Sequence, residues 1–282
     1  MKFKNKANLP EWVVRGLTMD NYARGAPPFD ISATGLNDSS MIRHLMKKHR
    51  GEIEKEALDM LPSAMGTAIH SIFEEANVNN ADVVCEKRLY FEVDGYNISA
   101  QYDIYEGRLA KITDIKTTSV WSIIFDKGSQ WEAQLNIQAY AAKQNGMEVE
   151  SLEVCAILKD WQRSKRWDDG YPRHPIVMIP IRLWEEHETL EYIQERLKVH
   201  FDYEPTCTDQ ERWKKPDKWA VDKEGRKSAV RVLNSKEEAE QYMEDNGLNN
   251  DAHHITHRVG GYIRCADYCT VSDFCPLNPK PF

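Results

Sequence analysis

The chain has 282 residues, 41% of them hydrophobic and 29% charged, and a formal net charge of −8 at pH 7. This length suffices for a sizeable core in one or two domains, and the acidic balance excludes a generally basic nucleic-acid coat but not a locally basic cleft. No stretch approaches the roughly 18 apolar residues of a membrane span, and the N-terminus has no apolar signal segment. We therefore expect a folded cytoplasmic protein with no membrane partner.

Helical and extended patterns alternate along the first two hundred residues. Helices are expected over 39–49, 62–77, 131–145 and 182–203. Strands are expected over 83–91, 96–105, 109–117, 152–158 and 177–181. Asp94-Gly95 and Glu106-Gly107 separate the first three strands, and both dipeptides are typical of hairpin turns. This order predicts an α/β fold in which helices flank one central mixed sheet.

The last quarter of the chain has a different composition. Residues 205–231 contain eight Lys or Arg against five Asp or Glu, whereas the whole chain is acidic. A short strand over 229–233 and a helix over 235–246 are expected next, and a run of cysteines follows. We divide the chain into a core, residues 1–204, and a C-terminal basic subdomain, residues 205–282, held by a metal centre.

An acidic cluster with a lysine lies in the predicted hairpin. Asp114 and Lys116 are two apart on one strand, so their side chains share a face, and Asp103 on the preceding strand can lie opposite them. Facing Cβ atoms of an antiparallel pair are about 5 Å apart, which suits two carboxylates that share one hard cation. A lysine beside that cation can hold a water or neutralise an oxyanion. In isolation, such alternating charge more often marks a solvated strand face.

Two helices contribute polar residues next to this cluster. His70 occurs in an apolar helical stripe just before the meander, where a core histidine is the ordinary interpretation. Gln134, Gln138 and Tyr140 lie on the following helix, where surface glutamine is the ordinary interpretation. Either helix can bring these groups to the sheet face that bears Asp114.

The ordered set Gly66-x-x-x-His70, Asp103, Asp114-x-Lys116 and Gln134 resembles the PD-(D/E)XK nuclease superfamily, above all its RecB-type branch and phage-borne exonucleases. The resemblance covers about a quarter of the chain, from Gly66 to Tyr140. It implies a restriction-endonuclease-like core. Where the family's helix motif has a tyrosine, this chain has Gln138, with Tyr140 two places on.

The resemblance also implies roles for individual residues. The metal ligands would be His70, Asp103, Asp114 and the backbone carbonyl of Ile115, and they would hold Mg²⁺ or Mn²⁺. The catalytic group would be Lys116, alongside Asp103 and Asp114, with Gln134 supporting the site. Glu86 is a weaker candidate for an accessory acid.

Three cysteines lie within eleven residues near the C-terminus. Cys265, Cys269 and Cys275 form a Cys-x₃-Cys-x₅-Cys run, a spacing that indicates ligands of one soft metal centre. Cys207 is the expected fourth ligand, and the alternatives are His253, His254 and His257. Some RecB-type nucleases are similar in having a C-terminal cysteine trio and a 4Fe–4S cluster, whose fourth cysteine lies near the N-terminus. This chain has no cysteine before Cys85, so we expect local closure, with iron–sulfur favoured over structural Zn²⁺.

Three basic runs are candidate phosphate contacts: Lys47–Arg50, Arg163–Arg166 and Arg212–Arg231. Trp161, Trp167, Trp213 and Trp219 are interleaved with the last two runs. Such a pattern allows cations to follow a backbone while aromatic rings stack on unpaired bases.

The leading hypothesis is a metal-dependent DNA exonuclease that acts at DNA ends or on single strands. The resemblance implies a setting in recombination or repair, in a bacterial or phage-infected cell. The alternative is a catalytically silent DNA-binding module that assembles with a helicase or recombinase partner. A metal-thiolate sensor is a third class, but it leaves the acidic cluster unexplained.

Overall fold

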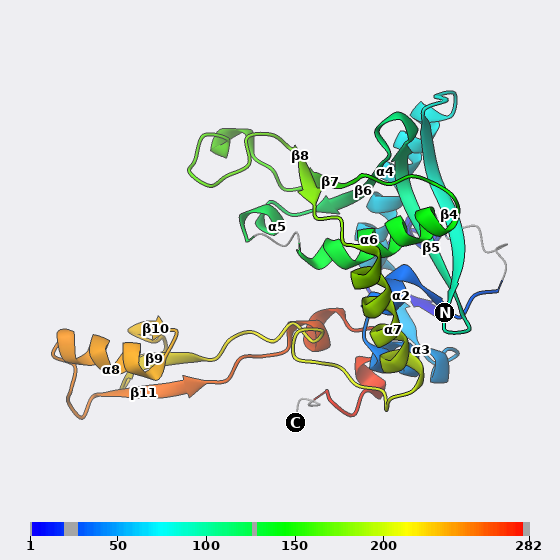
Figure 1. The fold of residues 1–282 in the computed structure, drawn as a ribbon. Coiled ribbons are helices and arrows are strands. Elements are labelled where there is room, and N and C mark those ends of the chain that lie inside the picture. The colour runs from blue at the N-terminus through cyan, green and yellow to red at the C-terminus, as the bar shows by residue number, and fades with distance from the viewer. Residues whose placement is uncertain (1, 20–27, 126–128, 279–282) are drawn as a thin grey trace.

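The computed structural model describes residues 2–19, 28–125 and 129–278 (Figure 1). The helices are α1 (Glu11–Thr18), α2 (Ala33–Asn37), α3 (Ser40–Lys48), α4 (Leu61–Asn77), α5 (Trp121–Ile124), α6 (Ser129–Gln144), α7 (Glu186–Phe201) and α8 (Lys236–Asp245). The strands are β1 (Lys2–Lys4), β2 (Ile31–Ser32), β3 (Glu54–Glu56), β4 (Val83–Val93), β5 (Tyr96–Glu106), β6 (Lys111–Thr118), β7 (Ser151–Leu158), β8 (Ile176–Ile181), β9 (Lys218–Lys223), β10 (Arg231–Leu233) and β11 (His253–Arg258). Every helix and strand expected between residues 39 and 203 is present, with ends that differ by a few residues.

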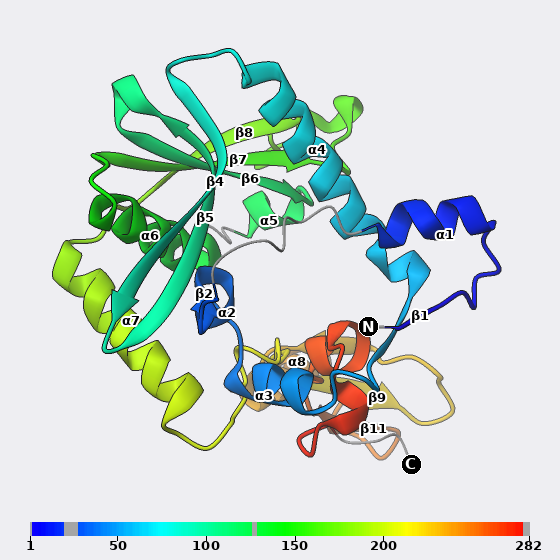
Figure 2. The same cartoon turned by 90° about the vertical axis from the view of Figure 1, so that its right-hand side faces the viewer.

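One six-stranded mixed sheet forms the centre of the larger part of the molecule, as the sequence predicts. β4 and β5 pair antiparallel over their whole length, and β2 and β6 share the other edge of β5. β6 pairs with β7 in parallel, and β8 closes the sheet antiparallel to β7. The sheet passes between α4 on one side and α6 on the other, with α7 packed outside α6 (Figure 2).

A fork in this sheet positions the site. β5 and β6 share only three residue pairs, from Glu106↔Lys111 to Ile104↔Thr113, and then they diverge. Beyond the fork, the edge of β5 is taken by the short parallel strand β2, which leads directly into α2. Side chains from α4 and α6 can therefore both reach the space between β5 and β6.

Helix α6 is buried on almost all sides. Leu135 and Ile137 are fully buried in the main core, and the polar Asn136 between them is only 1% exposed. The Asn136 side chain donates to the carbonyl of Arg182 at 2.9 Å and accepts from the backbone N–H of Trp184 at 2.7 Å. This one amide thus ties α6 to the connection between β8 and α7, and it satisfies two backbone groups there.

The C-terminal part consists of two pieces. Residues that carry the cysteines pack on α3, where Val271 joins Ile42, Leu45 and Ile53 in a small apolar cluster. Farther out, β9, β10 and β11 form a three-stranded sheet with α8 packed on it. The strand expected over 229–233 is β10 and the helix expected over 235–246 is α8, whereas β9 and β11 are not anticipated. The division at residue 205 stays a prediction.

Within the described residues, no helix combines the length and the apolar character needed to cross a membrane.

Replacing Asn136 tests how strongly the α6 amide supports the core. Asn136→Ala leaves the Arg182 carbonyl and the Trp184 N–H without their partners, so we expect the free energy of unfolding to fall by about 2–4 kcal/mol. Urea denaturation followed by circular dichroism measures the loss. Gln144→Ala, at the exposed end of the same helix, is the control and should change stability by less than about 0.5 kcal/mol. If Asn136→Ala lowers the free energy of unfolding by no more than the control does, the Asn136 amide does not stabilise the core in this way.

Candidate active site

A cavity of about 380 Å³ opens in the fork between β5 and β6. All six residues expected to form the site line it: His70, Asp103, Asp114, Ile115, Lys116 and Gln134. The start of α2 forms another part of the wall through Ser32, Ala33 and Thr34. Five elements, α2, α4, β5, β6 and α6, therefore meet at one polar cavity.

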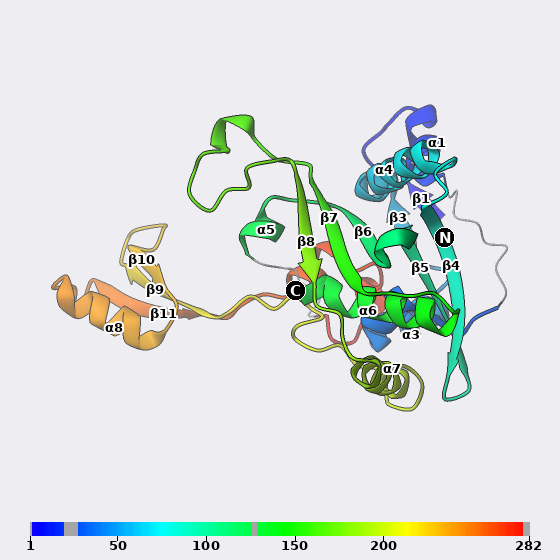
Figure 3. The ribbon, with the colours of Figure 1, turned by 45° about the horizontal axis from the view of Figure 1, so that its top comes forward.

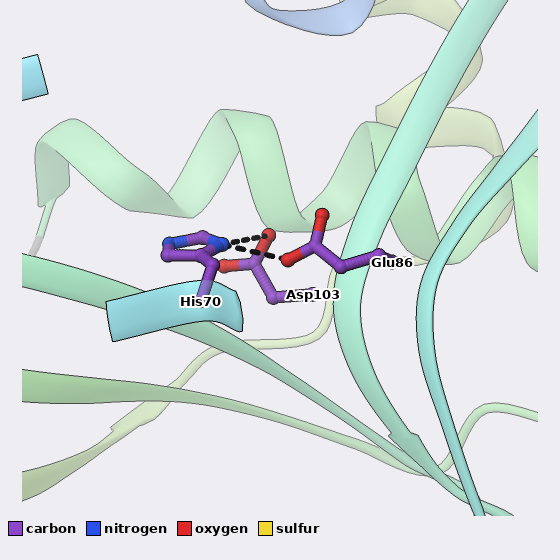
Figure 4. A group of neighbouring side chains, drawn as sticks. All are labelled: His70, Glu86 and Asp103. Atoms are coloured by element: carbon purple, nitrogen blue, oxygen red, sulfur yellow. Dashed lines mark hydrogen bonds and ion pairs between the residues drawn. The ribbon is translucent and has the colours of Figure 1, made fainter. Parts of the chain in front are cut away.

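His70, Glu86 and Asp103 form the tightest group of acidic and imidazole side chains at the site (Figure 4). His70 Nδ1 lies 2.7 Å from Glu86 Oε1 and 3.7 Å from Asp103 Oδ1. Its other nitrogen, Nε2, lies 3.3 Å from the carbonyl oxygen of Ile115. One potential ligand atom from each of the three side chains falls within 4.8 Å of the other two, and among the described residues no other such trio of His, Cys, Asp or Glu occurs.

Glu86 reaches this group from an unusual backbone conformation. Its φ is +50°, in the left-handed region that non-glycine residues rarely adopt, although it lies within β4. The paired residues on either side, Cys85↔Ile104 and Lys87↔Tyr102, keep the register of the hairpin. Left-handed backbone at such a position costs of order 1–3 kcal/mol and is found most often at functional sites. The strain indicates that Glu86 belongs to the site more firmly than its sequence pattern predicts.

Asp114 contacts Lys116 and Gln134 and is not part of the His70–Glu86–Asp103 group. Its side chain is 1% exposed, and its Oδ2 lies 2.6 Å from Lys116 Nζ. That oxygen receives no well-directed hydrogen bond from a described residue, so the contact is an ion pair. Gln134 bridges the pair, because its Nε2 donates to Asp114 Oδ1 at 3.1 Å and its Oε1 accepts from Lys116 Nζ at 3.4 Å. Lys116 is thus held at the cavity wall by two partners.

A further layer of side chains supports Glu86. Gln101 donates to Glu86 Oε2 at 2.6 Å and accepts from Arg88 at 3.0 Å. Gln138, which is 1% exposed, donates to the backbone carbonyl of Gln101 at 2.8 Å. Sequence reasoning did not assign a role to Gln101 or Arg88, although Gln101 precedes Asp103 by the two residues of a strand repeat. Tyr140 packs edge-on against Phe91 in the core, and it does not line the cavity.

Two ionisable groups of the site, Asp103 and His70, have strongly shifted pKa values. Burial, together with the nearby Asp114 carboxylate, raises the pKa of Asp103 from 3.8 to about 7. The hydrogen bond to Glu86 raises the pKa of His70 from 6.5 to about 9, with a further contribution from Asp103 and in opposition to burial. In the absence of another cation, the site therefore takes up protons to balance its carboxylates.

This donor set fits a divalent cation. Carboxylate and carbonyl oxygens are the ligands of Mg²⁺, and an added imidazole also suits Mn²⁺. The carboxylates are withdrawn from water and draw protons onto Asp103 and His70, which is what a group of ligands does when no cation balances it. The ligands expected from the sequence, His70, Asp103, Asp114 and the Ile115 carbonyl, all border the cavity, and Glu86 adds a carboxylate behind His70.

The four C-terminal cysteines lie in one region but do not form a compact ligand group. The thiols are half-buried, and Cys265 is close enough to influence both Cys207 and Cys269. Burial raises the pKa of the Cys207 and Cys269 thiols. No three of the four sulfurs, all within the described residues, come within 4.8 Å of one another.

The alternative fourth ligands have other partners. His257 binds Asp217 at 2.8 Å and stacks on Trp219, and His253 contacts Asn250 at 2.8 Å. Both histidines lie on β11 in the outer three-stranded sheet, together with His254. Cys207 is therefore better placed than these histidines to complete a centre with Cys265.

Comparison with known proteins identifies a family for one segment only. Residues 211–268 match the family model described as "Uncharacterized protein conserved in bacteria (DUF2188)". No curated protein sequence matches the chain.

Two crystal structures resemble the fold at low sequence identity. One is SSO0001, with 16% identity and a TM-score of 0.49, covering 72% of this chain and 91% of that chain. The other is a phage-related exonuclease from Haemophilus somnus 129PT, with 14% identity and a TM-score of 0.30, covering 72% of this chain and 87% of that chain. Both TM-scores lie below 0.5, so the function of this chain has to be inferred from the residues of its own cavity.

The shifted pKa values predict how the stability of the metal-free chain depends on pH. Both groups have pKa values that are higher in the folded than in the unfolded chain. The stability that Asp103 contributes is therefore fully present below about pH 4 and is lost as the pH rises through about 7. The stability that His70 contributes is fully present below about pH 6.5 and is lost as the pH rises through about 9. Thermal unfolding with EDTA should show a melting temperature that falls over this range, and Mn²⁺ at pH 8 should restore it.

A neutral substitution separates this effect from general acid or base unfolding. Asp103→Asn removes a buried charge but keeps an acceptor for the Ile115 N–H, now 2.6 Å from Asp103 Oδ2. It should raise the melting temperature of the metal-free chain at pH 8 and abolish the response to Mn²⁺. Asp82→Asn, at an exposed acid paired with Arg108, is the control and should leave both unchanged. A wild-type melting temperature that rises with pH would contradict the charge assignment.

Proposed function

We propose that this chain is a metal-dependent DNA nuclease with a PD-(D/E)XK core, acting as an exonuclease on DNA ends or single strands. The observation that carries the proposal is the cavity in the β5–β6 fork, where Asp103, Asp114 and Lys116 meet. Carboxylates that bind a hard cation next to one lysine are what metal-assisted phosphodiester hydrolysis requires. The setting in recombination or repair, with a helicase or recombinase partner, stays a prediction from the family resemblance.

The metal would be held by His70, Asp103, Asp114 and the carbonyl of Ile115. When bound, Mg²⁺ or Mn²⁺ polarises the scissile phosphate and lowers the pKa of water. Glu86 keeps the His70 ring in place through the 2.7 Å contact to Nδ1, which leaves Nε2 directed toward the Ile115 carbonyl and the cavity. An outer carboxylate that orients a ligating imidazole in this way is common at metal sites.

Lys116 would act on the reacting groups directly. Its ammonium group lies at the cavity wall, where it can hold the attacking water or stabilise negative charge on the phosphate oxygens in the transition state. Asp114 pairs with the ammonium group at 2.6 Å, and Gln134 fixes its direction. Arg88 also lines the cavity, and it makes no ion pair with a described residue, so its guanidinium is available to a phosphate.

Cleavage of labelled DNA tests the nuclease proposal. Linear duplex, circular duplex and single-stranded DNA are incubated with Mg²⁺ or with EDTA, and products are resolved on gels. We expect metal-dependent release of nucleotides from linear DNA. Lys116→Ala should lower the rate by at least about 100-fold, because it removes a charge that acts in the transition state. Asp103→Asn and Asp114→Asn should abolish cleavage.

A second lysine on the same strand provides the matched control. Lys111 begins β6 at the far side of the fork, where it pairs with Glu106 and Glu153. Lys111→Ala should cleave DNA at nearly the wild-type rate. DNA binding without any cleavage by wild-type protein would instead support a silent binding module, and full activity in Asp114→Asn would place the active site elsewhere.

We also propose that Cys207, Cys265, Cys269 and Cys275 hold a 4Fe–4S cluster or, alternatively, a structural Zn²⁺. They lie on two chain segments in one region of the structure, and Arg212 donates to the sulfur of Cys265 at 3.5 Å. Cys269 and Cys275 both contact the apolar cluster on α3. A centre at this position would close the C-terminal subdomain locally, because all four ligands lie between residues 207 and 275.

Metal analysis of anaerobically purified protein tests the cysteine centre. We expect either about four irons with absorbance near 400 nm or one zinc per chain. Cys269→Ser should lose this metal and lower the melting temperature by several degrees. Cys155→Ala, at a cysteine in β7 far from the run, should retain it. Wild-type protein without iron or zinc, or a Cys269→Ser variant that keeps the metal, would contradict the assignment.

A further inference from the structure

Two segments that carry exposed cations project from the same side of the molecule. The upper arm is the connection between β7 and β8, residues 159–175, and the lower arm is the outer sheet with α8 and its stem, residues 214–262. In Figures 1 and 3 both arms extend in the same direction away from the sheet that bears the cavity, one above the other. In Figure 2, turned so that the right-hand side of Figure 1 faces the viewer, both arms point away from the viewer.

The upper arm starts close to the catalytic lysine. Lys116 pairs with Ala156 in the parallel β6–β7 ladder, and β7 ends two residues later at Leu158. The arm that follows has five cations and three acids: Lys159, Arg163, Lys165, Arg166 and Arg173 against Asp160, Asp168 and Asp169. In the described part of the chain none of these cations forms an ion pair. Trp167 is 70% exposed and lies between the guanidinium groups of Arg166 and Arg173, at 4.9 and 5.0 Å.

The lower arm separates its charges. The hairpin between β9 and β10 carries four exposed cations and one acid: Lys223, Arg226, Lys227 and Arg231 against Glu224. None of the four forms an ion pair with a described residue. Five of the nine acids of this arm, which has nine Lys or Arg in all, lie on α8, whose sequence is KEEAEQYMED. On a chain with a net charge of −8, such separation creates a local positive field at the hairpin.

The stem of the lower arm is tightly built. Residues Lys214 and Tyr262 bridge its two chains, and the Lys215 N–H donates to the Gly261 carbonyl at 2.9 Å. The backbones approach so closely that a Cβ on Gly260 would lie 1.7 Å from the Lys215 carbonyl oxygen. From Lys214 to the end of β9 the chain runs ten residues, about 30 Å when extended, which is close to one turn of duplex DNA at about 34 Å.

We propose that the two arms bind the phosphate backbone of duplex DNA and hold it while an end enters the cavity. This inference deepens the proposed nuclease function and rests on it. The hairpin of the lower arm offers cations without an available aromatic partner, because Trp219 is stacked on His257 and packed beside α8. Proteins that grip single strands interleave cations with exposed rings, whereas backbone contacts to a duplex need only cations, which favours a duplex at the lower arm. In the upper arm the exposed ring of Trp167 is engaged by Arg166 and Arg173.

Charge reversal in each arm tests the proposal. Arg226→Glu with Lys227→Glu alters the lower arm, and Arg163→Glu with Arg166→Glu alters the upper arm. All are made in full-length Lys116→Ala protein in EDTA, so that binding is measured without cleavage. Fluorescence anisotropy with a labelled 30-base-pair duplex is recorded at several salt concentrations. We expect each pair to weaken duplex binding at least about tenfold at 100 mM salt and to reduce the slope of log K against log salt by one to two.

An equal charge change elsewhere is the control. Lys6 and Lys198 are exposed and lie outside both arms and outside the three basic runs, and Lys6→Glu with Lys198→Glu changes the net charge by the same amount. This variant should bind duplex like its parent. Circular dichroism and melting curves verify that each variant is folded.

Three results would overturn the proposal: unchanged duplex affinity in both arm variants, an equal loss in the Lys6→Glu with Lys198→Glu control, or an equal loss for a single strand of the same length. These results are independent of the nuclease test. Arm-dependent duplex binding by a wild-type protein that does not cleave DNA would refute the nuclease proposal and leave the binding surface in place. If the wild-type protein cleaves DNA but the arm variants bind duplex normally, the arm proposal is refuted and the nuclease proposal stands.

Discussion

Asp103 and Asp114 occupy facing positions on β5 and β6, just beyond the last paired residues, and both carboxylates are withdrawn from water. Two carboxylates buried at facing positions of neighbouring strands cannot both stay ionised without a compensating cation. Lys116 compensates Asp114 directly, while Asp103 has only the protonated His70 at 3.7 Å and the Ile115 N–H. The need for further positive charge at this point explains the raised pKa values, the fit to a divalent ion and the arrangement of the surrounding side chains.

The topology supplies what this charge arrangement requires. A fork between two strands leaves backbone groups free to meet side chains, and the Ile115 N–H accordingly binds the Asp103 carboxylate where a continuous ladder would bind a neighbouring strand. α4 and α6, on opposite sides of the sheet, both deliver polar side chains to the fork, His70 from α4 and Gln134 and Gln138 from α6. The parallel pairing of β6 with β7 then places the upper arm next to Lys116.

Much of this arrangement follows from local patterns. The two-residue strand repeat suffices to put Asp114 and Lys116 on one face, and the hairpin turns suffice to bring Asp103 opposite them. The position of the Glu86 side chain does not follow from the two-residue strand repeat, because the left-handed backbone at Glu86 interrupts that repeat. β9 and β11 are not predicted from the sequence. Their segments, KWAVDK and HHITHR, are short and rich in charged and polar residues, so they lack the apolar pattern of a strand. The contact between Val271 and α3 joins residues too distant in sequence for any local pattern to indicate.

Direct measurement of Mn²⁺ binding tests the central claim, that the acidic fork is a cation site. Isothermal titration calorimetry at pH 8 should show wild-type protein binding Mn²⁺ with release of protons, since His70 must lose its proton to become a ligand. Asp114→Asn should bind at least about tenfold more weakly, whereas Lys111→Ala should bind like wild type. Equal Mn²⁺ affinity in wild-type and Asp114→Asn protein, or no binding by either, would contradict the account.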